Sequence, residues 1–113
     1  FDWAREDIEA LERAFAHIKL KPSDQDARAQ LLDAAYAIKS QAGIFGYPLG
    51  TEVAGVLVEY VTSRRKFNAN NLIVIAKHID TINVVFKQKI KEDGEAIARD
   101  MISSLKKLIF KLG

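Results

Sequence analysis

The sequence predicts an all-α protein arranged as an antiparallel helical bundle. Apolar side chains recur at every third or fourth position along five segments, which is the spacing of an amphipathic helix. No segment shows the period-2 alternation that is typical of a strand. Short breaks that contain Gly, Pro, Asn or Asp separate the segments, and long helices joined by short loops favour antiparallel neighbours.

The first two predicted helices cover about residues 3–20 and 25–45. Pro22 interrupts the pattern between them, and Asp24 offers a capping side chain for the second helix. The expected core face of the first helix consists of Ala4, Ile8, Leu11, Phe15 and Ile18. The expected core face of the second consists of Leu31, Ala35, Ile38, Ala42 and Phe45. Gly46 is expected to end the second helix.

The third and fourth predicted helices cover about residues 49–66 and 71–91, with a break over residues 68–71. Gly55 in the third helix allows the close approach of a neighbour. Its expected core residues are Val53, Val56, Leu57 and Tyr60. The fourth helix is the most apolar, with a face formed by Leu72, Ile75, Ala76, Ile79, Ile82, Phe86 and Ile90.

The last predicted helix covers about residues 95–111 and follows a break at Asp93-Gly94. Its expected core residues are Ile97, Met101, Leu105, Leu108 and Ile109. The five segments together predict a single domain over residues 1–113, because a chain of this length buries one core and is too short for two.

Composition restricts the class of protein further. Hydrophobic residues are 49% and charged residues 28% of the chain, which is typical of a soluble globular domain. No apolar run is longer than the five residues 72–76, which excludes a membrane span. The absence of cysteine excludes disulfides and thiolate metal sites and fits a cytoplasmic protein. The chain begins at Phe1 without a secretory signal, and we expect it to be part of a longer protein.

The net charge of +2 hides an asymmetry along the chain. Residues 1–63 carry 6 basic and 10 acidic side chains, whereas residues 64–113 carry 11 basic and 5 acidic ones. The basic residues of the second half are dispersed at helical spacing among acids, which favours a solvated helix surface over a nucleic-acid site. The cluster at residues 64–66 lies near a predicted helix C-terminus, where cations offset the helix dipole.

One segment carries a family resemblance. Residues 35–49 read AYAIKSQAGIFGYPL. This segment resembles the signature of histidine phosphotransfer (HPt) domains, the helical bundles that relay phosphoryl groups between receiver domains in bacterial two-component signalling. The signature reads His-x-Leu-Lys-Gly-x-Ala, with a glycine ten residues after the histidine. The matching positions are Lys39, Ala42 and Gly46. The differing positions are Ile38 for a leucine, Ser40 for a glycine, and Tyr36 for the phosphoacceptor histidine.

The resemblance covers more of the chain than this motif. Residues 43–49 look like the Gly-x-Phe-Gly-Tyr-Pro-Leu run of one HPt subgroup, and residues 77–83 are similar to an Ala-His-Val-Asp-Ala segment of the same subgroup. The similarity covers about residues 30–100. It implies an antiparallel four-helix bundle of the HPt type with an additional helix.

The side of the second helix that bears Tyr36 is the candidate binding face. At about 100° per residue, Tyr36 points away from the core face, and Leu32, Lys39, Ser40 and Gly43 share its side. The resemblance implies that this face docks a receiver domain or a histidine kinase. Small neighbours leave room for the aspartate of a receiver, and Lys39 can stabilise charge on a phosphoryl group. A structural interpretation stays open, in which Tyr36 and Leu32 only pack beneath the first helix or a terminal extension.

Tyrosine in place of histidine changes the expected chemistry. Imidazole attacks an aspartyl phosphate and forms a labile N–P bond, so transfer runs in both directions. A phenol, with a pKa near 10, is barely ionised at neutral pH, and a phosphotyrosine is a stable ester that cannot recharge an aspartate. We therefore expect a binding module without a catalytic residue or a cofactor, which acts as a competitor, a scaffold or an allosteric regulator.

An alternative hypothesis is an active phosphotransferase that uses another residue, such as His78. This residue is predicted to lie at the edge of the apolar face of the fourth helix, near Asp80 and Asn83, but it lacks an accompanying lysine. His17, the other histidine, is predicted at the edge of the first helix. Two isolated histidines with scattered carboxylates predict no metal site.

A third hypothesis is a structural bundle that dimerises through its fourth helix or packs inside a longer protein. The apolar face of that helix is widened by Val74, Val84 and Val85. The sequence does not predict the oligomeric state.

Overall fold

Helices account for nearly all of the backbone in the computed structural model, which describes residues 2–90 and 95–113. Over these ranges the chain forms α1 (Asp2–Leu20), α2 (Gln25–Ile44), α3 (Pro48–Thr62), α4 (Ala69–Lys87) and α5 (Glu95–Leu112). The described residues contain no strand. The prediction of an all-α protein is therefore confirmed.

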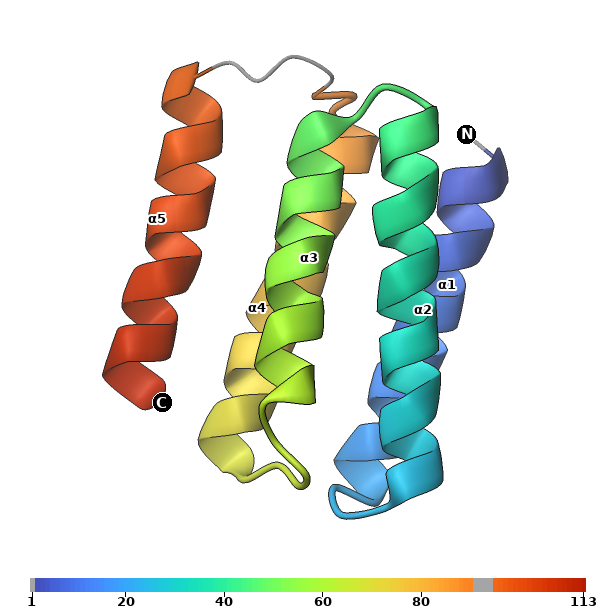
Figure 1. The fold of residues 1–113 in the computed structure, drawn as a ribbon, viewed down its shortest axis with the longest axis vertical. Coiled ribbons are helices and arrows are strands. Elements are labelled where there is room, and N and C mark those ends of the chain that lie inside the picture. The colour runs from blue at the N-terminus through green and yellow to red at the C-terminus, as the bar shows by residue number, and fades with distance from the viewer. Residues whose placement is uncertain (1, 91–94) are drawn as a thin grey trace.

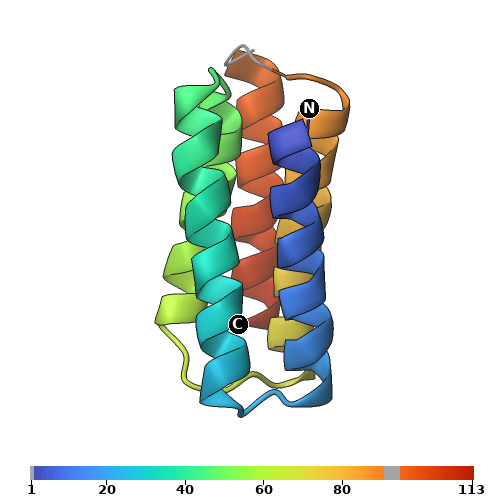
Figure 2. The ribbon, with the colours of Figure 1, turned by 90° about the vertical axis from the view of Figure 1, so that its right-hand side faces the viewer.

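Consecutive helices run in opposite directions and pack side by side (Figures 1 and 2). α1 also packs against α4, so that each of the first four helices has two neighbours among them. α5 packs against α4 and lies on the side of the molecule away from α1 and α2 (Figure 1). None of the described helices combines the length and the apolar content that crossing a bilayer requires.

Local capping residues define both ends of α2. The side chain of Asp24 accepts a hydrogen bond from the backbone N–H of Asp26 at 2.9 Å, which satisfies a free donor at the start of the helix. At the other end Gly46 has φ +82°, a conformation that glycine adopts without steric cost. Pro48 then occupies the first turn of α3, where no backbone donor is lost. These predicted boundaries agree with the structure to within one residue.

The end of α3 differs from the prediction. α3 ends at Thr62 rather than near residue 66, so Arg64 follows the helix instead of lying in its last turn. Arg28 of α2 donates hydrogen bonds to the carbonyl oxygens at this end. The acceptors are Arg64 at 2.8 Å, Thr62 at 3.1 Å and Val61 at 3.4 Å. Arg28 therefore adds to the local hydrogen bonds that Ser63 and Arg64 donate at this helix end, and no local sequence signal reveals its contribution.

α4 spans residues 69–87 rather than 71–91. Asn68 and Asn71 form a reciprocal capping box, in which each side chain accepts a hydrogen bond from the backbone N–H of the other, at 2.8 and 2.9 Å. The asparagine-rich segment that was predicted to be a break therefore forms the cap and the first turn of α4. The predicted break at Asp93-Gly94 lies outside the described residues.

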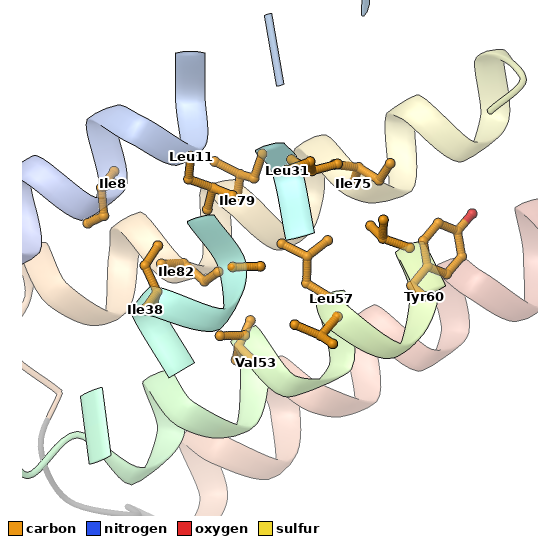
Figure 3. Close-up of a cluster of buried hydrophobic side chains, with 14 of the residues drawn as sticks. Ile8, Leu11, Leu31, Ile38, Val53, Leu57, Tyr60, Ile75, Ile79 and Ile82 are labelled. Atoms are coloured by element: carbon orange, nitrogen blue, oxygen red, sulfur yellow. The ribbon is translucent and has the colours of Figure 1, made fainter. Parts of the chain in front are cut away.

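The core runs between the helices and is filled mainly by aliphatic side chains (Figure 3). Most predicted core positions are buried. Seven predicted core residues outside α3 are only half-buried: Phe15, Leu72, Ala76, Ile90, Met101, Leu108 and Ile109. As further corrections, Phe45 is 48% exposed and Ile97 49% exposed, and Val56 of α3 is also only half-buried. α3 instead buries residues on more than one side because it packs between α2 and α4. The additional buried residues of α3 are Ala54, Val58 and Val61. α5 buries a narrower stripe, formed by Ile102 and Leu105.

An aromatic cluster holds the start of α1 against the α2–α3 connection. The ring of Trp3 stacks on Phe45 with 4.8 Å between centroids and contacts the edge of Phe86 at 5.3 Å. Tyr47, which is fully buried, lies 5.0 Å from Phe86. Phe45 is therefore displaced from the predicted core face into this cluster.

Hydrogen bonds from α3 and α4 hold the end of α5. The carbonyl oxygen of Gly113 accepts from Arg64 Nη2 at 2.6 Å, from Asn71 Nδ2 at 3.1 Å and from Tyr60 Oη at 3.2 Å. The guanidinium of Arg64 also lies 3.7 Å from the centroid of the Tyr60 ring. These contacts fix α5 at its C-terminal end.

Candidate functional site on the outer face of α2

The side chains predicted to share the Tyr36 face lie on the outer surface of α2. Tyr36 is 50% exposed, and Lys39, Ser40 and Gly43 are exposed. Leu32 is partly buried and packs against the core. An outer helix surface is usually covered by charged side chains. This one offers an aromatic ring, a hydroxyl and a glycine around a single ammonium group.

Tyr36 and Lys39 contact each other across one turn of α2. The Nζ atom of Lys39 lies 6.0 Å from the centroid of the Tyr36 ring, at the outer limit of a cation–π contact. Because both side chains reach solvent, the contact contributes little to stability. The Lys39 ammonium nevertheless lies beside the ring rather than extending away from it.

α3 forms a second side of this surface. The hydroxyl of Thr51 donates a hydrogen bond to the backbone carbonyl of Lys39 at 3.1 Å. A Cβ atom placed on Gly55 would lie 3.7 Å from Cε of Lys39, so the aliphatic part of the lysine passes over this glycine. The predicted close neighbour of Gly55 is therefore the Lys39 side chain. Thr51 was not singled out by the sequence, and its only signal is that it lies one turn before Gly55.

Two glycines lie where α2 and α3 meet at the end of this face, and only one of them is required by packing. A Cβ atom on Gly50 would lie 3.0 Å from Cζ of Phe86 and 3.2 Å from Cβ of Ala42, which is closer than an ordinary contact. A Cβ atom on Gly43 would lie 3.5 Å from Oγ1 of Thr51, an ordinary van der Waals contact. Gly50 is thus required by packing, whereas Gly43 has space for a side chain.

His78 lies in the interior and not at the edge of α4, which corrects the prediction. It is fully buried, and its Nδ1 donates a hydrogen bond to the backbone carbonyl of Val74 at 2.7 Å. Its ring stacks on Tyr60 with 6.1 Å between centroids, and Nε2 has no hydrogen-bond partner among the described residues. Burial lowers the pKa of His78, partly opposed by the hydrogen bond to Val74. No protein partner can reach this ring without opening the bundle.

The other histidine and the polar residues near His78 form no common site with it. His17 is half-buried, with Nδ1 3.1 Å from Oε1 of Gln30 on α2. Asp80 is exposed, and the amide of Asn83 donates to the carbonyl of Ile79 at 3.4 Å. Across residues 2–90 and 95–113, no group of three or more histidine and carboxylate side chains could hold a metal ion.

Most of the broad apolar surface of α4 lies inside the molecule, whereas Ile73 is 53% exposed. Val74 and Val85 are fully buried, and Val84 is half-buried beside α5. The width of the apolar face is explained by packing on α1, α3 and α5. These valines therefore offer little surface to a second chain.

In comparisons with known proteins, no family model matched the chain, and neither the curated proteins nor the solved structures gave a significant match.

Proposed function

We propose that this chain is an HPt-like module of a two-component phosphorelay, which binds a receiver domain or a histidine kinase through the outer face of α2 and does not accept phosphate. The observation that carries the proposal is the exposed position of Tyr36 beside Lys39. Tyr36 takes the place of the phosphoacceptor histidine in a segment that resembles the HPt signature, and it has the accessibility that a docking residue needs.

The arrangement of the helices supports the same function. The first four helices each pack on two others of the four, as expected for a four-helix bundle of the HPt type, and α5 takes the role of the additional helix. The small or short side chains Ser40 and Gly43 are exposed beside Tyr36, so a partner surface can approach the backbone of α2. Such a transient signalling interface buries on the order of 1,200 Å².

The two alternative functions have less support. A phosphotransferase based on His78 needs an accessible imidazole, and that ring is fully buried. Dimerisation through the valines of α4 needs exposed side chains, and Val74 and Val85 have none of their surface exposed. The Tyr36 face is the better candidate because most of its side chains, unlike those of His78, Val74 and Val85, are exposed to a partner.

A substitution at Gly43 tests the binding surface. The probes are purified receiver domains and histidine kinases encoded in the same genome, measured against the protein by isothermal titration calorimetry. Gly43→Arg is expected to abolish binding to any partner found, because a long charged side chain blocks the centre of the face. The melting temperature should change little, because Gly43 is exposed and the added Cβ makes an ordinary contact.

The matched control is Ser103→Arg, the same new side chain at an exposed position of α5, away from α2 (Figure 1). This variant should bind like the wild type. Unchanged affinity of Gly43→Arg would show that the Tyr36 face is not the docking surface, and failure of every receiver and kinase to bind would overturn the proposed function itself.

A further inference from the structure

Lys39 belongs to α2, but its side chain lies against α3. The hydroxyl of Thr51 bonds to the backbone carbonyl of Lys39, and the lysine stem passes over Gly55, where a Cβ atom would be 3.7 Å from Cε and 4.0 Å from Cδ. The third contact is the Tyr36 ring, 6.0 Å from Nζ. The stem of Lys39 therefore lies over Gly55 of α3, and its ammonium lies beside Tyr36 of α2. Thr51 bonds to the backbone from which this side chain extends.

We propose that Gly55 and Thr51 are positioning residues of the docking surface, which hold Lys39 beside Tyr36 so that its ammonium meets an anionic group of the partner. The inference rests on the proposed function and deepens it, because it assigns two residues of α3 to a site so far described on α2. The ligand chemistry is a carboxylate, or the phosphoryl group carried on it, because an ammonium is a compact cation with three donors.

The physical reason is conformational entropy. A lysine has four rotatable side-chain bonds and loses about 2 kcal/mol of rotamer entropy when it is fixed by a partner. A side chain that already lies in its bound position loses less on binding. Gly55 makes this position available because a larger residue would occupy the space of the lysine stem. Thr51 links the backbone of α2 at Lys39 to α3 and so fixes the two helices at this point.

The first test uses the protein alone. The Lys39 ammonium lies 6.0 Å from the centroid of the Tyr36 ring. We therefore expect a ring current at the ε and δ protons of Lys39, and different NMR shifts for these protons in the wild type and in Tyr36→Leu. Gly55→Leu should move these shifts toward those of Tyr36→Leu, because the larger side chain displaces the lysine. Gly55→Ala is the matched control and should leave them in place, since its methyl group fits at an ordinary contact distance. Wild-type Lys39 shifts in Gly55→Leu would overturn the inference.

The second test is a double-mutant cycle with a receiver domain that binds the wild type. Gly55→Leu and Lys39→Ala are each expected to weaken binding by about five- to tenfold and to reduce the salt dependence of the association rate. The double variant should bind no more weakly than Lys39→Ala alone, because both changes remove the same contact. Additive losses would show that the new leucine blocks the partner directly and would overturn the inference.

The outcomes separate the two proposals. If no receiver or kinase binds, the proposed function fails, while the NMR comparison still decides whether α3 holds Lys39. If a receiver binds but Gly55→Leu acts independently of Lys39, the proposed function stands and the positioning role is wrong. Thr51→Val, which removes the hydroxyl at nearly constant volume, should weaken binding less than Gly55→Leu.

Discussion

Tyr36 on α2 and His78 on α4 are the two positions at which acceptance of a phosphoryl group can be considered, and their surroundings are opposite. Tyr36 is 50% exposed, with an ammonium group and small side chains around it. His78 is fully buried, bonded to a backbone carbonyl and stacked on the ring of Tyr60. Tyr36 is accessible but carries a phenol rather than an imidazole, and the imidazole of His78 is inaccessible.

At these two positions, exposure to solvent and an imidazole side chain are therefore found on different helices. A docking face needs exposed side chains and a backbone held in place. The Tyr36 face of α2 is largely exposed, and its backbone is held by contacts with α3. The imidazole of His78 contributes to the interior as a packing residue with a single hydrogen bond. The same substitution should therefore have very different consequences at the two positions.

The largest expected difference is in stability. His78→Ala should lower the free energy of unfolding by about 2–4 kcal/mol, because it leaves a cavity and removes the stack on Tyr60. Tyr36→Ala should lower it by less than about 1 kcal/mol, because the ring is half exposed and its contact with Lys39 is weak. Urea unfolding of the two variants measures both values. Equal costs would mean that His78 is not part of the core.

A smaller difference concerns pH. Burial lowers the pKa of His78 in the folded state, so the unfolded chain binds the proton more readily. The resulting stability is fully present above the unfolded pKa, near 6.5, and is lost as the pH falls below it. One proton limits the slope to about 1.4 kcal/mol per pH unit.

His78→Gln is the control for this pH effect, because it removes the titrating group. The stability advantage of the wild type over this variant should shrink as the pH is lowered from about 7.5 to about 5. Tyr36→Phe should follow the wild type over the same range. Parallel curves for the wild type and His78→Gln would contradict the burial of a neutral imidazole.

The smallest change in stability is expected for Tyr36→His, the substitution that replaces the phenol with an imidazole. The free energy of unfolding of Tyr36→His should lie within about 0.5 kcal/mol of the wild-type value, because the position faces outward. With a phosphorylated receiver, the wild type should acquire no acid-labile, alkali-stable label, whereas Tyr36→His supplies the imidazole beside Lys39 and should acquire one. Ser40, where the HPt signature has glycine, is the expected remaining obstacle, so Tyr36→His/Ser40→Gly should label more strongly.

Two results would contradict this expectation. Label on the wild type that disappears in His78→Gln would restore the hypothesis of an active His78. An inert double variant, tested with every receiver that binds the protein, would show that the face has changed beyond these two residues.

The sequence predicted the helices best where the signals are local. The carboxylate of Asp24 and the positive φ of Gly46 mark the ends of α2, and both are recognisable from residue type alone. The end of α3 was predicted too late, and one of the groups that satisfies the carbonyls there, Arg28, is far away in the sequence. A hydrogen bond between helices depends on the geometry with which they cross. The spacing of apolar residues along the sequence gives no information on that geometry.

The same distinction applies to the candidate site. The helical angle was sufficient to predict that Tyr36 and Lys39 lie on the outer surface of α2. It could not show that Lys39 crosses Gly55, because that contact requires the relative register of α2 and α3. His78 was predicted at an edge because the period identifies one buried face, whereas α4 packs on α1, α3 and α5. The functional role of the face stays a prediction.

The stacked position of Trp3 gives the protein an intrinsic fluorescent reporter. The sequence contains one tryptophan, so its emission comes from a single site. That indole contacts Phe45 at the end of α2 and Phe86 on α4 while belonging to α1, and its environment therefore changes when these three helices separate. None of the substitutions proposed above alters this aromatic cluster. The unfolding of every variant can thus be followed without a label, by one optical signal that reports the same event in each.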